Sequence, residues 1–203
     1  MQNYDENDTA AAGFASSNEQ TTNLTLVTRE QIEQRLENAS AEDQGWLARQ
    51  DFNGKKGDIA WLTDGSCVIG WDGKDNIAAL GHLPMQLPEG SYKFTHSITD
   101  LQAVGWGLGA YQFDRYKDAS RAPARLLLDA GNDLTQVMDK VCATLLTRDL
   151  INTPSQDMAP SHLEAEATAL AERFAAQIEV TVGDELLDRE CGAIHAVGRA
   201  AAD

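Results

Sequence analysis

The apolar positions of the chain follow two periods, one typical of helices and one typical of strands. Within residues 134–146, apolar side chains recur every three or four positions, as on a helix with one buried face. The stretch from Arg148 to Pro160, RDLINTPSQDMAP, interrupts this pattern. Because Pro154 lacks an N–H and disfavours helical geometry at the preceding residue, the helix is predicted to end ahead of residues 152–154. Pro160 suits the first turn of a second helix.

Upstream of this junction, the pattern predicts helices mixed with strands. Thr28 and Ser40 are good N-caps ahead of apolar residues, so two short helices are expected before Asp51. Two short apolar runs flank Asp64-Gly65, a dipeptide typical of hairpin turns, and predict two antiparallel strands. The further expected elements are a helix over 76–80, a strand over 92–96, a helix capped by Thr99 or Asp100 with Leu101, Val104 and Leu108 on its face, and a strand over 125–128.

Downstream of the junction, the spacing predicts a helix, then a strand, then a short helix near residues 186–187. The apolar positions that define the first two are Leu163, Ala167, Leu170 and Phe174 for the helix, and Ile178, Val180 and Val182 for the strand. Strands that alternate with helices are typical of the α/β class. A lone strand needs neighbours to cover it, so this part is expected to dock on other strands, self-associate or fray.

Composition divides the chain into four expected parts. Residues 1–23 are rich in Asn, Asp, Ser, Thr and Ala and predict a disordered tail. Residues 24–130 are expected to form a layered N-terminal α/β domain with an early hairpin, and residues 131–151 a connecting helix. Residues 152–203 are expected to form the incomplete start of a second α/β domain, with its first α-β-α elements.

Charge and cysteine content exclude several classes of protein. The 32 acidic and 16 basic residues give a net charge of -16, which argues against a nucleic-acid or anionic-membrane partner. Neither a secretory leader nor an apolar run of about 20 residues is seen. The cysteines are odd in number, widely spaced and without a CxxC pair, which disfavours a disulfide framework and a zinc knuckle. A soluble, cytoplasmic protein is expected.

No residue of the chain is predicted to be catalytic, cofactor-binding or metal-binding. The glycines of GWGLG lie in a helical pattern rather than a phosphate-binding turn, and favour close helix packing. The histidines are far apart in sequence and form neither an HxxxH nor an HExxH set. The groups considered, each with a structural interpretation preferred, are Gly105, Gly107, Gly109, His82, His96, His162, His195, Asp114-Arg115-Tyr116-Lys117, Arg148, Asp149 and the cysteines Cys67, Cys142 and Cys191.

The junction resembles the entry to the catalytic domain of the leucyl aminopeptidase (cytosol aminopeptidase) family of metallopeptidases. That family has a similar sequence motif at this position. The residues that match it here are Arg148, Asp149, Leu150, Asn152, Pro154 and Pro160, whereas Gln156 and Ala159 depart from it. Supporting similarities are the runs LPEGSY at 87–92, LGAYQFDRYK at 108–117 and HAVG at 195–198.

The resemblance implies a fold, a metal centre and an assembly. It implies an N-terminal domain similar to macro domains, joined by a helix to a larger α/β catalytic domain. In this family two divalent ions, zinc or manganese, are held by Lys, Asp and Glu residues, the first of them in a VGKGxxFDTGG-type motif. The 203 residues lack that motif, so no cofactor is expected in this chain alone. The partners implied are the remainder of the catalytic domain, other copies in a hexamer and, for the full enzyme, peptide substrates.

Two alternatives stay open beside this interpretation. One is a free-standing macro-like module that binds a nucleotide or a protein, although neither a glycine-rich phosphate loop nor a basic cluster is present. The other is an inactive scaffold protein. Under the preferred interpretation, the chain is the N-terminal portion of an enzyme that removes amino-terminal residues from peptides, and it serves in assembly and in access to the active site.

Overall fold

The computed structural model describes residues 4–199, and the chain divides into two compact units. Unit 1 comprises residues 1–146 and unit 2 comprises residues 147–203. Residues 1–3 of the predicted tail and residues 200–203 of the predicted second domain lie outside the described residues. The helix α6 (Leu134–Asn152) carries the chain from one unit into the next. Each unit is therefore described by itself.

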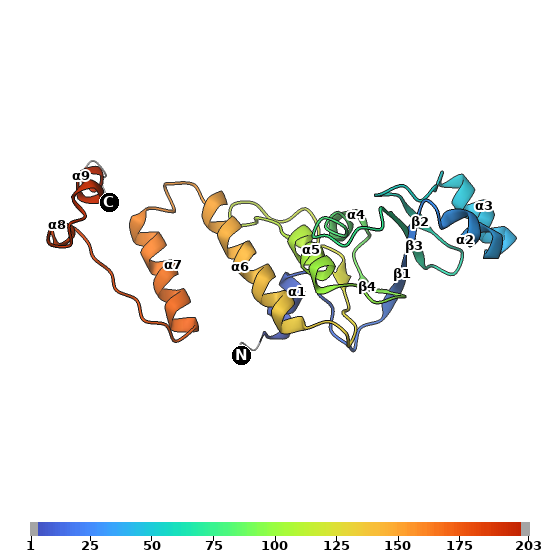
Figure 1. Ribbon diagram of the computed structural model, residues 1–203, viewed down its shortest axis with the longest axis horizontal. Coiled ribbons are helices and arrows are strands. Elements are labelled where there is room, and N and C mark those ends of the chain that lie inside the picture. The colour runs from blue at the N-terminus through green and yellow to red at the C-terminus, as the bar shows by residue number, and fades with distance from the viewer. Residues whose placement is uncertain (1–3, 200–203) are drawn as a thin grey trace. The chain divides into compact units, whose positions relative to one another are not determined.

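Within the described residues, unit 1 is built on a five-stranded mixed sheet (Figure 1) with the order β2-β3-β1-β4-β5. The central strand runs parallel to its two neighbours, and the edge strand β2 is antiparallel to β3. This antiparallel pair confirms the predicted hairpin. The strands are β1 (Thr21–Thr28), β2 (Ile59–Trp61), β3 (Cys67–Trp71), β4 (Ser91–Phe94) and β5 (Arg125–Leu126).

Helices pack on both faces of this sheet because its strands point apolar side chains to both sides. Alternate residues of β1 enter different clusters: Leu26 joins the larger core, and Val27 the smaller. The larger core is completed by α4 (Leu83–Gln86), α5 (Asp100–Ala110) and α6. The smaller core is completed by α2 (Ile32–Asn38) and α3 (Ala41–Arg49).

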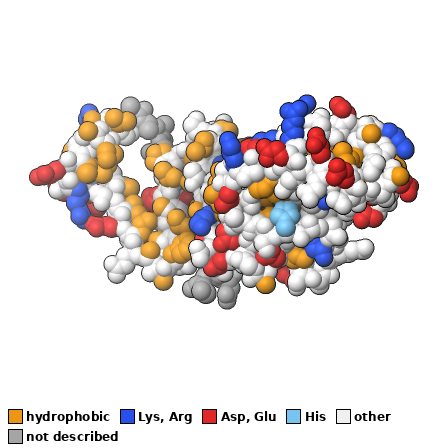
Figure 2. All heavy atoms as spheres, turned by 45° about the vertical axis from the view of Figure 1, so that its right-hand side comes forward, with side chains coloured by type: hydrophobic (Ala, Val, Ile, Leu, Met, Phe, Trp, Pro, Cys, Tyr) orange, Lys and Arg blue, Asp and Glu red, His pale blue; other side chains and the backbone are white. Residues whose placement is uncertain are grey.

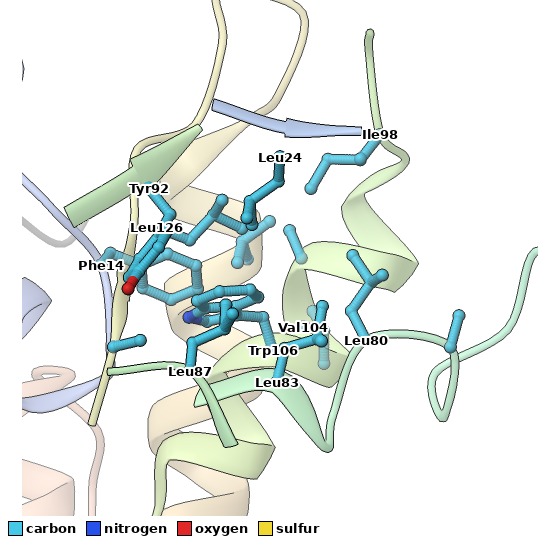
Figure 3. Close-up of a cluster of buried hydrophobic side chains, with 14 of the residues drawn as sticks. Phe14, Leu24, Leu80, Leu83, Leu87, Tyr92, Ile98, Val104, Trp106 and Leu126 are labelled. Atoms are coloured by element: carbon cyan, nitrogen blue, oxygen red, sulfur yellow. The ribbon is translucent and has the colours of Figure 1, made fainter. Parts of the chain in front are cut away.

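Trp106 of α5 is the largest fully buried side chain of unit 1. Figure 3 shows its ring among Phe14, Leu83 and Leu87. Its Nε1–H donates to the Gly13 carbonyl at 2.9 Å, so the one polar atom of the ring is satisfied. The core therefore ties helix α5 to the N-terminal segment.

Local capping chemistry sets where several helices begin. Of the two predicted caps, Thr99 rather than Asp100 caps α5, and it forms a reciprocal capping box with Gln102. Ser40 accepts from the Asp43 backbone N–H at 3.0 Å and caps α3. Pro160 occupies the first turn of α7 (Pro160–Arg173), which confirms the predicted restart after the junction.

The glycines of α5 allow close backbone packing, as the sequence analysis favours. A Cβ on Gly105 would overlap the Ile77 carbonyl, and one on Gly109 would overlap the Gly81 carbonyl. A Cβ on Gly107 would lie 2.8 Å from Val141 Cγ2. Side chains at these positions would push α5 away from its neighbours, so the GWGLG run is a packing motif.

The N-terminal stretch differs from the predicted disordered tail. Residues Glu6–Ala11 form helix α1, which Asp5 caps with a capping box to Asp8. Phe14 is only 2% exposed and bridges to Leu126 as a parallel partner. The strand β1 then begins at Thr21. The polar composition of this stretch predicted disorder. A capped helical turn and one buried Phe are nevertheless enough to anchor the segment.

Other elements of unit 1 differ in detail from their predictions. Residues 76–80 form turns rather than a helix, and the one-turn helix α4 begins later, at Leu83. The helix α5 is buried on most sides, yet Leu101, expected on its buried face, is 45% exposed. Thr28 ends β1 instead of capping α2, although its N–H still bonds to Gln31 Oε1.

Unit 2 consists of helices and irregular segments in the part that the structure describes. Its helices are α7, α8 (Glu185–Asp188) and α9 (Gly192–Gly198). Residues 176–182, expected to form a strand around Val180, have no regular structure. A strand exists only when its backbone N–H and C=O groups pair with a neighbour, and none of the described residues supplies one here.

Candidate functional site

The described histidines and cysteines do not form a chemical centre. Among residues 4–199, no three His, Cys, Asp or Glu side chains come close enough to hold a metal ion. Burial and the positive charge of Lys56 lower the pKa of His82, and burial alone lowers the pKa of His96. His162 accepts from the Ala159 N–H and thereby helps to begin α7. His195 lies 3.0 Å from Asp184 at the surface of unit 2.

The three cysteines are free thiols that are buried or half-buried. Burial raises the pKa of the Cys67 thiol to about 12, so this sulfur stays protonated at neutral pH. Cys142 lies on α6 and packs against the larger core, as expected from its place on an apolar face. Cys191 is half-buried in unit 2, and its Sγ bonds to the Arg189 carbonyl. These surroundings do not activate a nucleophile.

The charged run Asp114–Lys117 is exposed in the loop after α5, in agreement with the solvated interpretation. Tyr116 packs edge-on against Phe113, with ring centroids 5.8 Å apart, and Arg115 lies over the Tyr116 ring. Arg148 and Asp149 both lie on the last turns of α6.

Two hollows open near the carboxyl ends of β4 and β5 in unit 1. The larger, of about 450 Å³, lies between the N-terminal segment and the loop after β5. The smaller, of about 110 Å³, lies beside the ends of β4 and β5 and includes His96. Both include Asp129, whose Oδ1 accepts from the Gly131 N–H. Polar groups converge in neither hollow with a nucleophile and a base in contact, so neither resembles a catalytic site.

Glu19 forms the best-connected ionic cluster of unit 1. Its carboxylate accepts a hydrogen bond from Ser91 Oγ and lies 2.7 Å from Arg125 Nη2. The hydrogen bonds from Ser91 and the Ser16 N–H, with the charge of Arg125, lower the pKa of Glu19 against the opposing effect of burial. The cluster fastens the N-terminal segment to β4 and β5. Sequence reasoning missed it because Glu19 falls in the predicted tail.

Unit 2 carries an extended apolar surface in place of a core. None of the described residues of α7, α8 and α9 is buried. Figure 2 shows hydrophobic side chains exposed over this part of the chain. We call the following residues the apolar surface of unit 2: Leu163, Leu170, Phe174, Ile178, Val180, Val182, Leu187, Ile194 and Val197, each 42% to 76% exposed. Exposed apolar groups in such number mark an interaction surface.

None of the helices among the described residues is both long enough and apolar enough to cross a membrane.

Comparisons with known protein families give these two units an identity. Residues 22–129 match the model of the M17 aminopeptidase N-terminal domain. Residues 145–203 match the model of the cytosol aminopeptidase family catalytic domain. The two matches follow each other in the order that the junction motif predicts.

Curated relatives carry the same designation. The chain is 31% identical over 140 residues to a probable cytosol aminopeptidase of Pseudomonas paraeruginosa, covering 63% of this chain and 27% of that protein. It is 29% identical over 108 residues to a probable cytosol aminopeptidase of Geotalea uraniireducens, covering 47% of this chain and 22% of that one. The chain thus spans about a quarter of the length of these relatives.

Solved structures agree in fold. The crystal structure of the cytosol aminopeptidase from Coxiella burnetii matches with a TM-score of 0.83 and 27% identity, over 93% of this chain and 43% of that one. A mutant of tomato leucine aminopeptidase matches with a TM-score of 0.57 and 17% identity, over 86% of this chain and 44% of that one, and shows likeness of fold alone.

The α/β sheet of unit 1 and the helical junction after it are therefore those of a two-domain metallopeptidase class. The chain belongs to the M17, or cytosol aminopeptidase, family. It comprises the N-terminal domain of that family and the start of its catalytic domain, which confirms the resemblance and the fold class read from the sequence.

Proposed function

We propose that this chain acts as the N-terminal part of a metallo-aminopeptidase that removes amino-terminal residues from peptides. The observation that carries the proposal is the apolar surface of unit 2, in the region that matches the start of the catalytic domain. A catalytic α/β domain covers such groups with layers from its further strands. The partner of this surface is therefore the remainder of an M17 catalytic domain.

The metal chemistry belongs to that remainder. M17 enzymes are metal-dependent, and we propose two divalent ions, zinc or manganese, for the active assembly. Such ions activate a water and stabilise the oxyanion that develops on the attacked carbonyl. Among the described residues, no group of three or more His, Cys, Asp or Glu side chains could hold such an ion.

Unit 1 has a supporting role in this proposal. We infer that it packs against other copies in a homo-oligomer, a hexamer as the family resemblance implies, and restricts access to an interior site. The relatives are described as cytosol aminopeptidases, which supports a cytoplasmic location. The net charge of -16 supports peptides rather than nucleic acid as the substrates.

A fusion experiment tests this proposal. The chain is expressed alone and fused to the part of the Coxiella burnetii enzyme that follows the aligned region. The fusion is expected to hydrolyse leucine anilide when manganese or zinc is added, whereas the chain alone is expected to be inactive. Activity of the purified chain alone, or a fusion that folds with metal bound but without activity, would count against it.

A matched pair of variants isolates the role of the apolar surface. In the fusion, Val180→Asp should abolish activity because it places a charge in an interface that becomes buried. Glu179→Asp, at the neighbouring exposed position, should leave activity within about twofold because it keeps the surface charge. Equal effects of the two substitutions would show that the surface is not covered by the catalytic domain.

A further inference from the structure

The centre of the sheet in unit 1 contains a switch in the direction of the chain connections. The strand β1 has β3 on one side and β4 on the other, so the chain leaves β1 toward one side and later crosses to the other. Pairing with β3 continues to Thr28, whereas pairing with β4 covers only Thr21 to Leu24. Ligands of open α/β sheets bind at the carboxyl ends of strands near such switch points.

A hollow of about 350 Å³ lies along this half of β1, where helix α2 follows it. The strand presents Thr25 and Val27 on the side of α2, and the helix and its first flanking residue contribute four polar side chains. The lining residues are Thr25, Leu26, Val27, Gln31, Gln34, Arg35 and Asn38.

The lining differs in charge from the rest of the molecule. It holds an arginine and no carboxylate, although the chain has twice as many acidic as basic residues and Asp129 lines both hollows described above. Arg35 is half-buried, and none of the ion pairs among the described residues involves it. The charge of Arg35 contributes to the lowered pKa of Asp43, but the hydrogen bonds to that carboxylate come from Thr63 and Ser40. The guanidinium is therefore available for an external anion.

Two of the three carboxamides of the hollow have their orientation fixed by internal hydrogen bonds. Gln31 Oε1 accepts from the Thr28 N–H at 3.0 Å, which leaves its Nε2 group as a donor. Asn38 Nδ2 donates to the Gln34 carbonyl at 2.7 Å, which leaves its Oδ1 as an acceptor. The hollow thus combines a cationic fork, a neutral donor and a neutral acceptor.

We propose that this hollow binds an α-carboxylate that is next to an amine or amide N–H, as in a free amino acid or the carboxyl end of a short peptide. The Arg35 guanidinium pairs with the carboxylate through two parallel hydrogen bonds, and Asn38 accepts from the adjacent N–H. A single arginine matches a monoanion, whereas a phosphate dianion would add uncompensated charge to a chain of net charge -16. Val27, whose side chain lies on the α2 side of the sheet, faces the apolar part of the ligand.

The test of this site does not depend on the peptidase role proposed above, because the binding of a ligand to the chain is measured without any catalysis. The isolated 203-residue chain, labelled with ¹⁵N, is titrated with L-leucine, glycyl-L-leucine, L-leucinamide and inorganic phosphate. We expect saturable amide shifts at residues 31–38 for the first two probes, with a Kd on the order of 1 mM. The tighter of the two identifies a free amino acid or a peptide end as the source of the carboxylate.

Variants assign the binding to Arg35. Arg35→Gln should weaken binding about tenfold or more because the charged fork is lost, and Arg35→Lys should weaken it by several-fold because the charge remains without the fork. Arg49→Gln removes one exposed positive charge from the neighbouring helix α3 and should change Kd by less than about twofold. Amide spectra of each variant establish that unit 1 is folded.

The proposal is overturned by any of four results. Saturable shifts from L-leucinamide equal to those from L-leucine would show that the carboxylate is not recognised. Equal affinity for inorganic phosphate would show a general anion site. An absence of saturable shifts up to about 10 mM L-leucine and glycyl-L-leucine, or binding that Arg35→Gln leaves unchanged, would show that the hollow does not take this ligand.

Discussion

The two units use similar apolar residues and similar helices, yet only unit 1 buries them. Trp106, Phe14 and Val141 are almost completely buried in unit 1, whereas Phe174 and Val182 of unit 2 are 58% and 60% exposed. The helix α7 nevertheless has 14 residues, a proline in its first turn and a regular apolar spacing. Helix formation is thus a local property, and burial requires a sheet that supplies a facing layer.

The largest expected effect lies in the core of unit 1. Trp106→Ala removes the central ring and its bond to Gly13, and should cost about 3–5 kcal/mol of unfolding free energy, a large share of a typical domain's stability. Urea unfolding followed by circular dichroism measures the loss. Trp46→Ala, at a position 42% exposed, is the control and should cost less than about 1 kcal/mol. Comparable losses would contradict the placement of the core.

A pair of identical substitutions sharpens the role of close packing within unit 1. Gly105→Ala should destabilise by about 1–3 kcal/mol, because the added methyl overlaps the Ile77 carbonyl. Gly45→Ala should stabilise by about 0.5–1 kcal/mol, because α3 gains helix propensity and the new Cβ lies 3.5 Å from Arg49 Nη2. Thermal unfolding of both variants measures the two signs. A stabilised Gly105→Ala variant would refute the packing argument.

The attachment of the N-terminal segment has a pH dependence. Hydrogen bonds and Arg125 lower the folded-state pKa of Glu19 below 4.5, so the ionised side chain stabilises the fold above that pH. This stabilisation is lost as the pH falls through the folded-state pKa. Glu19→Gln should therefore cost about 1 kcal/mol at pH 7 and progressively less below pH 4.5. Urea midpoints across pH measure this. Glu37→Gln, on the exposed face of α2, is the control and should cost less than about 0.5 kcal/mol at pH 7.

The smallest effect on stability is expected in unit 2. Val197→Asp, at a position 76% exposed, should change the unfolding free energy by less than about 0.5 kcal/mol. It should nevertheless reduce self-association of the chain, because it breaks the apolar surface with a charge. Sedimentation velocity at several concentrations measures the mass. An unchanged mass distribution together with a large loss of stability would mean that Val197 belongs to a core.

The sequence predicted elements whose causes are local. Asp64-Gly65 specified the hairpin, Thr99 and Ser40 capped their helices, and Pro160 marked the start of α7. The family resemblance rested on the junction, where several uncommon residues occur at fixed spacing. These features depend on neighbours within a few positions, so they can be recognised from the sequence alone.

The elements that the sequence did not predict correctly depend on distant partners. The central strand β1 was absent from the predicted elements because its first residues fall in the polar stretch that was assigned to the tail, although Leu24 and Leu26 alternate with Thr. The reverse error occurred at Val180, where alternation predicted a strand that has no neighbour among the described residues. The hollow between β1 and α2 was also not predicted, because Thr25 and Arg35 come together only when α2 packs beside β1.

The N-terminal segment has a consequence for how the protein emerges from the ribosome. Tyr4 bonds to Asp139, 135 positions later in the chain, and Gly13 accepts from Trp106, 93 positions later. At a synthesis rate of roughly 5–20 residues per second, the first helix waits on the order of ten seconds for its partners. During that interval Phe14 has no core to enter. Nascent unit 1 should therefore complete its fold in one late step, when α6 leaves the exit tunnel, and slower translation through residues 107–139 should prolong the exposure of its amino-terminal end.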